Sequence, residues 1–239
     1  MRINIAHLYP ELLNLYSDRG NIICLQKRCE WRGIEVAVQE YQLNDELNLD
    51  DTDILFFGGG SDREQKIVAE RLQDFKSEIA EYIENDGVML AVCGGFELIG
   101  WNYQGAYEAD PEWTLLDTIT VDGDYRLIGN IVIESEIAGT IVGFENHAGR
   151  TFIGSHAPLG RVVHGFGNNS EDKIEGIIYK NLIGTYMHGP LLPKNPKLAD
   201  LIILKALRRK YGDDITLAEL DDTAEIRAHK YVVNRFAAK

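Results

Sequence analysis

The segment Val88-Met89-Leu90-Ala91-Val92-Cys93-Gly94-Gly95 joins five apolar residues to a cysteine and two glycines. A short, fully apolar run that ends in glycines is typical of a parallel strand covered on both faces. A second such run, Asp53–Phe57, leads into the glycines at 58–60. Because the functional crevice of an open α/β sheet lies at the carboxyl ends of its strands, we expect the two glycine-rich loops to meet at one site.

Strand and helix patterns alternate on both sides of this segment. Besides the two apolar runs, the patterns predict strands at Ile3–Leu8 and Ile34–Tyr41, and helices at Asn21–Arg32, Arg63–Glu84 and Phe96–Trp101. The helix at Asn21–Arg32 is expected to bury Ile22, Ile23, Leu25, Gln26 and Cys29 on one face. This order predicts an α/β fold with a mostly parallel sheet flanked by helices.

The second half of the chain changes character. Residues 115–186 hold short β-branched runs between turn residues, which predict additional antiparallel strands in a second sheet or as an extension of the first. Helices are predicted at Asn195–Tyr211, with Pro196 near the start, and at residues 215–235. We find no repeat or low-complexity linker and expect one domain over residues 1–239, with a core at about 3–211 and a helical extension at about 212–239.

The composition of the chain excludes several classes of function. The 239 residues carry a formal net charge of −14, which disfavours binding to a nucleic-acid backbone. No stretch of about 18 apolar residues predicts a membrane-spanning helix. The N-terminus starts as a strand and lacks the pattern of a signal peptide, so we expect a cytoplasmic protein.

The chain has three cysteines, and only one lies in a catalytic context. Cys24 and Cys29 fall inside a helical pattern without the spacing of a zinc site, and we interpret them as partly buried helix residues. Cys93 follows a buried strand and opens a predicted helix, as in a nucleophile elbow. Small residues at Ala91 and Gly95 allow so tight a turn, and the helix N-terminus is expected to lower the thiol pKa. The alternative is a buried structural cysteine.

A cysteine nucleophile requires a base, and histidine is the usual one. Of the six histidines, His188 lies after an apolar strand and before the Gly189–Pro190 turn, while His147 is its competitor. Spacing alone does not choose between them. The glycines at 58–60 are compatible with a flexible turn or with an oxyanion site; their place after an apolar strand favours the oxyanion site.

Four segments in order carry a family resemblance: Phe56–Gly60, Ala91–Glu97, Gly143–His147 and Gly184–Pro190. Together they resemble the class I glutamine amidotransferases of the cobyric acid synthase type. Three further segments, Leu8–Pro10, Tyr16–Asn21 and His188–Pro196, make the chain similar to the glutaminase subunits of lipid II isoglutaminyl synthases. The resemblance extends from Ile3 to about Tyr211.

The resemblance implies a role for each matched residue. Cys93 would attack the glutamine side-chain amide, and His188 would take the thiol proton and then protonate the departing ammonia. Backbone N–H groups of Gly59 or Gly60 and of Gly94 would form the oxyanion hole.

Arg126 and Pro190 complete the implied site. Arg126 falls where this subfamily carries a substrate-binding arginine, which would grip the glutamine α-carboxylate; an exposed strand arginine is the alternative. Many class I amidotransferases place a glutamate two residues after the histidine, where this chain has Pro190. The resemblance therefore implies a Cys–His dyad, or a carboxylate from elsewhere, and low glutaminase activity until a partner binds.

The sequence has no phosphate-binding motif such as a P-loop. A glutaminase of this kind would therefore need another protein to activate the acceptor of the ammonia with ATP. The resemblance implies a Mur-ligase-like partner that uses ATP and Mg to amidate the D-glutamate of lipid II, giving D-isoglutamine at the inner face of the membrane. We expect no cofactor or metal on this chain itself. The alternatives are a glutaminase subunit of another amide synthetase, such as a cobyrinate-type enzyme, a cysteine peptidase-like hydrolase on the same scaffold, and a non-catalytic subunit.

Overall fold

A six-stranded sheet, here called sheet A, forms the centre of the molecule. The computed structural model describes residues 1–104 and 115–237. Sheet A has the order β10-β11-β4-β3-β1-β2, and every neighbouring pair is parallel except β10 and β11. Its strands are β1 (Arg2–Leu8), β2 (Glu35–Tyr41), β3 (Ile54–Phe57), β4 (Val88–Val92), β10 (Ile177–Tyr179) and β11 (Leu182–Thr185). The predicted mostly parallel sheet is confirmed.

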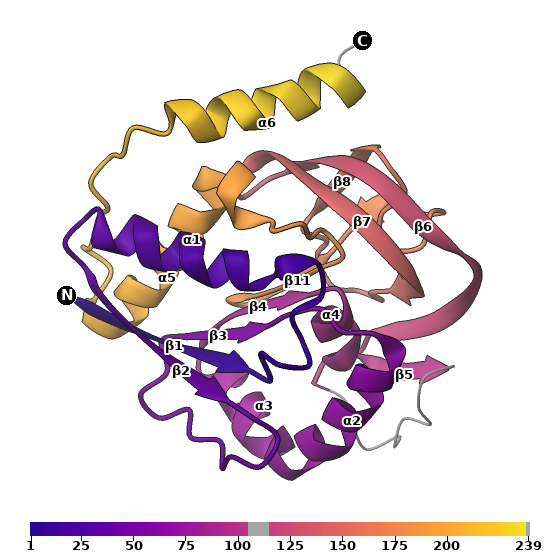
Figure 1. Ribbon diagram of the computed structural model, residues 1–239, viewed down its shortest axis with the longest axis horizontal. Helices are drawn as coiled ribbons and strands as arrows, with labels where there is room; N and C mark the ends of the chain where they lie inside the picture. Colours follow the sequence, from indigo (N-terminus) through magenta and orange to yellow (C-terminus); the bar gives the residue numbers. More distant parts are fainter. Residues whose placement is uncertain (105–114, 238–239) are drawn as a thin grey trace.

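Helices cover both faces of sheet A, as the alternation of patterns predicts. Figure 1 shows α1 (Arg19–Glu30) and α5 (Pro196–Tyr211) on one face and α2 (Asp62–Leu72) and α3 (Lys76–Glu84) on the other. Every residue of β3 and β4 is buried, which explains why their sequences are apolar throughout. Pro196 is the first residue of α5, where its missing N–H costs nothing.

Two details of the predicted helices are wrong. A short 3-10 turn, η2 (Gln73–Phe75), divides the single helix expected at Arg63–Glu84. In α1, Ile23 is 50% exposed, and Arg28 takes a buried position instead. Arg28 lies there because it pairs with Asp200 and Asp222 at 2.6 Å each, partners that are remote in sequence.

A second sheet, here called sheet B, accounts for the β-rich middle of the chain. It consists of β5 (Trp101–Gln104), β6 (Ile119–Ser135), β7 (Gly139–Phe152), β8 (Gly160–His164) and β9 (Ile174–Glu175). Some of the short runs expected within residues 115–186 belong to the single long strand β6, which forms an antiparallel hairpin with β7. The helix expected at Phe96–Trp101 is α4 (Gly94–Leu98), and Trp101 already begins β5.

The two sheets share one hydrophobic core and meet beside β11. Ile131, Ile133 and Ile141 of sheet B belong to the same buried cluster as the strands of sheet A. Phe144 and His188 exchange backbone hydrogen bonds of 3.2 and 2.9 Å, which join β7 to the segment after β11. This junction places part of sheet B over the carboxyl edge of sheet A.

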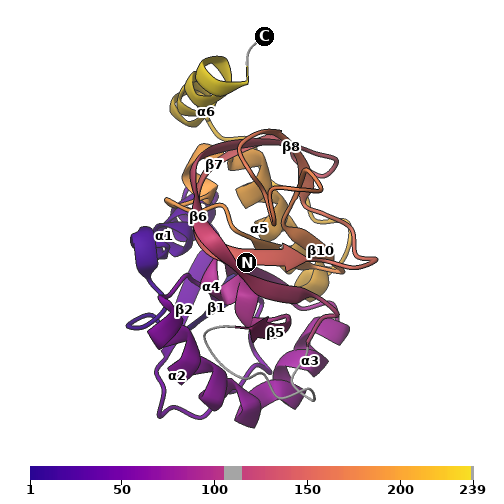
Figure 2. The same cartoon turned by 90° about the vertical axis from the view of Figure 1, so that its right-hand side faces the viewer.

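The C-terminal helix lies outside this core. Helix α6 (Thr223–Phe236) has no buried residue and lies on the outside of sheet B, where its Phe236 ring contacts that of His164; Figure 2 shows it at the edge of the molecule. A helix was predicted at residues 215–235, and the structure starts it later, at Thr223. In the described part of the chain, no helix combines the length and apolar character needed to cross a membrane.

Candidate active site

Three strands of sheet A end side by side and place their loops together. Phe57 of β3 is in register with Ala91 of β4, and Thr185 of β11 is in register with Val92. Because these strands are parallel, the loops that follow them leave from the same edge. The glycines at 58–60, Cys93 and the segment leading to His188 therefore leave from one edge, and the two glycine-rich loops lie together as the two apolar runs predict.

Cys93 occupies the tight turn between β4 and α4. Its φ of 51° and ψ of −112° are unusual for a residue with a side chain, and its N–H donates to the Thr185 carbonyl at 2.8 Å. Gly95 is required beside it, since a Cβ there would lie 2.7 Å from the Cβ of Phe57. Strain of this kind is held by surrounding structure and is common for catalytic nucleophiles.

Cys93 lies in the wall of a cavity of about 220 Å³. The wall also includes Gly60, Glu97, Arg126 and His147. The cavity thus combines a thiol, a backbone turn, a carboxyl, a guanidinium and an imidazole, which is the kind of convergent polar set expected of an active site.

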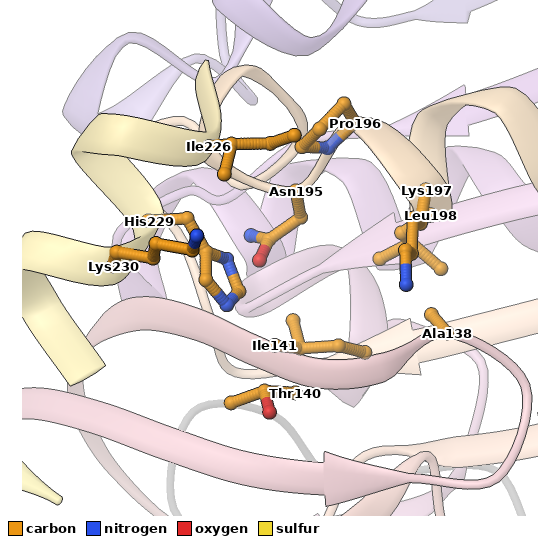
Figure 3. A pocket seen from close by; sticks show the side chains of 10 residues that line it. All are labelled: Ala138, Thr140, Ile141, Asn195, Pro196, Lys197, Leu198, Ile226, His229 and Lys230. Atoms are coloured by element: carbon orange, nitrogen blue, oxygen red, sulfur yellow. The ribbon is translucent and has the colours of Figure 1, made fainter. Parts of the chain in front are cut away.

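A roomier hollow of about 340 Å³ lies elsewhere, between α6 and the start of α5. Figure 3 shows Asn195, His229 and Lys230 among the side chains that line it. Its lining contains none of the predicted catalytic or substrate-binding residues. We therefore place the site in the smaller cavity, because the nucleophile is there.

His188 is fully buried and packs against two aromatic rings. The ring of Tyr16 lies 4.4 Å from the His188 ring, and that of Phe144 lies 6.2 Å away. Neither ring nitrogen of His188 has a hydrogen-bond partner among the described residues. Burial, followed by the charges of His147 and Arg126, lowers the pKa of His188 to about 4, so the ring is a neutral base near pH 7.

The competing histidine, His147, is held inside the cavity wall. Its Nδ1 lies 2.8 Å from the Gly149 carbonyl, and its ring stacks on Tyr186 at 3.6 Å. Glu145 Oε2 lies 3.9 Å from its Nε2, a distance too long for a hydrogen bond. Of the two candidate histidines, His147 lines the cavity and has a ring nitrogen hydrogen-bonded to the protein, whereas His188 is not among the lining residues.

The thiol does not have the lowered pKa that the helix N-terminus predicts. Burial, followed by the charges of Glu97 and Asp18, raises the pKa of Cys93 well above its usual value, and a hydrogen bond from the Gly94 backbone only partly offsets this. Helix α4 has only five residues, so its dipole is small. Cys93 is thus a neutral thiol that a base must deprotonate.

The backbone donors near Cys93 differ in their availability. The Gly59 N–H donates to Asp18 Oδ2 at 2.8 Å, so it is already engaged. A Cβ on Gly94 would lie 3.0 Å from the Gly60 amide nitrogen, so these two backbone segments approach closely. Of the three predicted oxyanion-hole residues, Gly60 and Gly94 are the pair with this arrangement.

Arg126 reaches the cavity from β6. Its Nε donates to Asn146 Oδ1 and its Nη2 donates to the Asn146 carbonyl, both at 2.8 Å. These bonds hold the guanidinium in the cavity wall. A fixed guanidinium is suited to a carboxylate ligand, and the substrate-binding role of Arg126 stays a prediction.

A family comparison decides how this arrangement is classified. Residues 4–196 match the model of the CobB/CobQ-like glutamine amidotransferase domain. The chain belongs to this family. The match covers the strands and loops that carry Cys93 and His188, and the predicted family resemblance is confirmed.

Similar amidotransferase chains cover nearly the whole sequence. The chain is 45% identical over 234 residues to the glutamine-hydrolyzing lipid II isoglutaminyl synthase subunit GatD of Staphylococcus aureus, covering 98% of this chain and 96% of that protein. It is 44% identical over 230 residues to GatD of Streptococcus pneumoniae, covering 92% of this chain and 86% of the relative. A crystal structure of a glutamine amidotransferase shares the fold, with a TM-score of 0.60 at 15% identity over 84% of this chain and 98% of that one.

Sequence reasoning missed two buried carboxyl groups of this amidotransferase site. Burial raises the pKa of Glu97 to about 7 and that of Asp18 to about 7. Glu97 accepts hydrogen bonds from Gln65 at 2.9 Å and from Tyr186 at 3.0 Å. Position offers one signal for Glu97, which lies one helical turn after Cys93. Asp18 offers none, because its link to Gly59 is purely tertiary.

No metal site accompanies these residues in the described part of the chain. No group of three or more His, Cys, Asp or Glu side chains within residues 1–104 and 115–237 is arranged to hold an ion. The other cysteines follow expectation: Cys29 is buried in α1, Cys24 is partly buried, and both are free thiols.

Proposed function

We propose that this chain is the glutamine-hydrolysing subunit of a lipid II isoglutaminyl synthase. The observation that carries the proposal is the strained, buried Cys93 in a cavity that also presents Arg126. The similarity to two GatD subunits over nearly the full chain supports this choice within the family.

The chemistry requires a nucleophile and one base. In our proposal, the Cys93 Sγ attacks the side-chain carbonyl carbon of glutamine while His188 accepts the thiol proton. The N–H groups of Gly60 and Gly94 stabilise the oxyanion. His188 then returns the proton to the nitrogen as the C–N bond breaks, which releases ammonia and leaves a glutamyl thioester. Water, deprotonated by His188, hydrolyses the thioester to glutamate and regenerates the thiol.

The raised pKa of the Cys93 thiol and the lowered pKa of His188 bear on this mechanism. Both groups are neutral near pH 7, so the resting pair is a thiol and an imidazole. Proton transfer is then coupled to attack on the substrate. Because Pro190 stands where many relatives carry a glutamate, we propose that a Cys–His dyad performs the reaction.

The cavity suits a free amino acid. Arg126 supplies a cation for the α-carboxylate, and Glu97 supplies an acceptor on the same cavity wall for the α-ammonium. The volume of about 220 Å³ lies below the typical range of about 300–1,000 Å³ for drug-sized ligands. It therefore favours glutamine over the extended substrate of a peptidase.

The ammonia needs an acceptor that this chain does not activate. We propose that a Mur-ligase-like partner binds ATP and Mg and activates the D-glutamate α-carboxyl of lipid II. The partner would then form D-isoglutamine with the ammonia, for peptidoglycan synthesis. The complex would act at the inner face of the membrane, with this chain attached through its partner.

The test is ammonia release from L-glutamine by the chain alone and with the co-expressed partner. We expect weak ammonia release by the chain alone and strong release by the complex. The reason is that neither ring nitrogen of His188 is hydrogen-bonded to another described residue of this chain. Strong activity of the isolated chain would contradict dependence on the partner. Absence of release in every combination would contradict the amidotransferase assignment.

A further inference from the structure

A strained segment, Leu15–Asp18, crosses the site and is here called the strap. Tyr16 has a φ of 58° and Ser17 a φ of 64°, in the left-handed region that large side chains rarely adopt. Tyr16 is 40% exposed, so burial of its ring in the core does not explain the strain. A strained residue at a functional site indicates that specific contacts hold it there.

The strap is hydrogen-bonded to the glycine loop at residues 58–60, which faces Cys93. The Leu15 N–H donates to the Gly59 carbonyl at 2.8 Å, and the Gly59 N–H donates to Asp18 at 2.8 Å. A Cβ on Gly59 would lie 3.2 Å from the Cβ of Cys93, so this loop packs directly against the nucleophile. The position of the strap is thus tied to the position of the site.

Tyr16 is the principal ring against His188. The two ring centroids are 4.4 Å apart with an interplanar angle of 53°. The His188 backbone is fixed by its bonds to Phe144, but neither ring nitrogen has a hydrogen-bond partner among the described residues. Within residues 1–104 and 115–237, aromatic packing is therefore the contact that can orient the imidazole.

The Tyr16 hydroxyl is connected to the cavity arginine. The Asn146 side-chain amide donates to the Tyr16 hydroxyl oxygen. The same Asn146 accepts both hydrogen bonds that hold Arg126, one on its side chain and one on its carbonyl. Tyr16 thus contacts His188 through its ring and is linked to Arg126 indirectly, through the bond between its hydroxyl and Asn146.

We propose that Tyr16 is a positioning residue that orients the His188 imidazole and, through Asn146, the Arg126 guanidinium. The inference rests on the proposed glutaminase function. The two halves of the side chain have separate effects. The ring governs the geometry of proton transfer, and the hydroxyl governs the grip on the substrate α-carboxylate.

The test compares two variants in the complex with the co-expressed partner. Tyr16→Phe keeps the ring and removes the bond to Asn146, so KM for glutamine should rise about fivefold with kcat within about twofold of wild type. Tyr16→Gly removes both contacts but accepts the positive φ without strain. It should raise KM similarly and lower kcat about tenfold or more, because a misoriented base is a poor one.

Two further variants serve as matched controls. Asn146→Ala removes the bond to Tyr16 and also the Arg126 Nε bond to Asn146 Oδ1, so it should raise KM at least as much as Tyr16→Phe. Tyr125→Phe removes a hydroxyl from a tyrosine that is 64% exposed and adjacent to Arg126 in sequence, and both constants should stay at wild-type values.

A kcat of Tyr16→Gly within twofold of wild type would overturn the role of the ring. An unchanged KM in Tyr16→Phe would overturn the role of the hydroxyl, and this result does not depend on how well the glycine variant folds. If wild type itself releases no ammonia in the complex, the proposed function fails. If wild type is active and the Tyr16 variants match it, only this inference fails.

Discussion

Two strained turns meet at the site, and they are held in different ways. Cys93, with a φ of 51°, is 5% exposed and sits between two fully formed strands and a helix. Tyr16, with a φ of 58°, is 40% exposed and belongs to the strap. The first turn is held by close packing, whereas the second is held by a few hydrogen bonds and one ring contact.

This difference separates what is rigid in the site from what is adjustable. A turn enclosed by core residues resists displacement, because its neighbours have no room to relax. A turn held by individual contacts can be altered one contact at a time. The nucleophile therefore belongs to the rigid part, and the residues that orient the base and the substrate belong to the adjustable part.

The largest expected effect is the loss of catalysis in Cys93→Ala. Ammonia release by the complex should fall by a factor on the order of 10⁴ or more, since removal of a nucleophile costs most of the rate. The thermal unfolding midpoint should change by only a few degrees, because the substitution removes one sulfur atom. Release above one hundredth of the wild-type rate would remove Cys93 from the mechanism.

The packing of the first turn is tested by Gly95→Val. A Cβ at Gly95 would lie 2.7 Å from the Phe57 Cβ and 2.8 Å from the Gly58 carbonyl oxygen. Overpacking should lower the free energy of unfolding by about 2–3 kcal/mol, measured by chemical denaturation. Gly129→Ala is the control, since a Cβ there has no neighbour within 4 Å, and it should change stability by less than about 0.5 kcal/mol. Equal losses in the two variants would refute the packing argument.

The strap anchor is tested by the pH dependence of Asp18→Asn. Burial raises the pKa of Asp18 to about 7 from an ordinary value of 3.8. The folded chain binds this proton more tightly than the unfolded chain, so wild type loses stability as pH rises between these values and stays level above them. Asparagine keeps an acceptor for the Gly59 N–H without the charge.

Asp18→Asn should therefore stabilise the chain by about 1–3 kcal/mol near pH 8 and by less near pH 5. Denaturant unfolding at both pH values measures the difference. Asp50→Asn, at an exposed loop position, should follow wild type at each pH. A gain for Asp18→Asn that does not grow between the two pH values would contradict the raised pKa.

The smallest expected effect concerns strain in the strap itself. Ser17 has a φ of 64° and an exposed side chain, so Ser17→Gly removes strain without removing a buried contact. The free energy of unfolding should rise by about 0.5 kcal/mol, after the entropic cost of glycine. A measurable loss of stability would indicate that the serine side chain holds the strap.

Much of the fold follows from local patterns. The apolar runs of β3 and β4 predict buried parallel strands, and Pro196 predicts the start of α5. The break in the helix at Gln73–Phe75 and the burial of Arg28 do not follow from such patterns. The burial of Arg28 depends on partners far along the chain, Asp200 and Asp222, while nothing in the structure explains the break in the helix.

The same division applies to the site. The turn at Cys93 can be predicted from the sequence, because it requires small residues nearby and Gly95 has no room for a side chain. The expectation that the Cys93 thiol has a lowered pKa was wrong, because burial raises this pKa more than the dipole of a five-residue helix lowers it. The assignment of roles to His188, Arg126 and the glycines stays a prediction that the mutants above test.

The sequence by itself determined the strand-turn-helix around the nucleophile, because local sterics and apolar periodicity act between neighbouring residues. Only the tertiary structure decided that Asp18 takes the Gly59 N–H, that Tyr16 lies against His188 and that Asn146 holds Arg126. Each of these contacts joins residues separated by many positions. No local pattern encodes them, since they exist only when the two sheets and the strap are assembled.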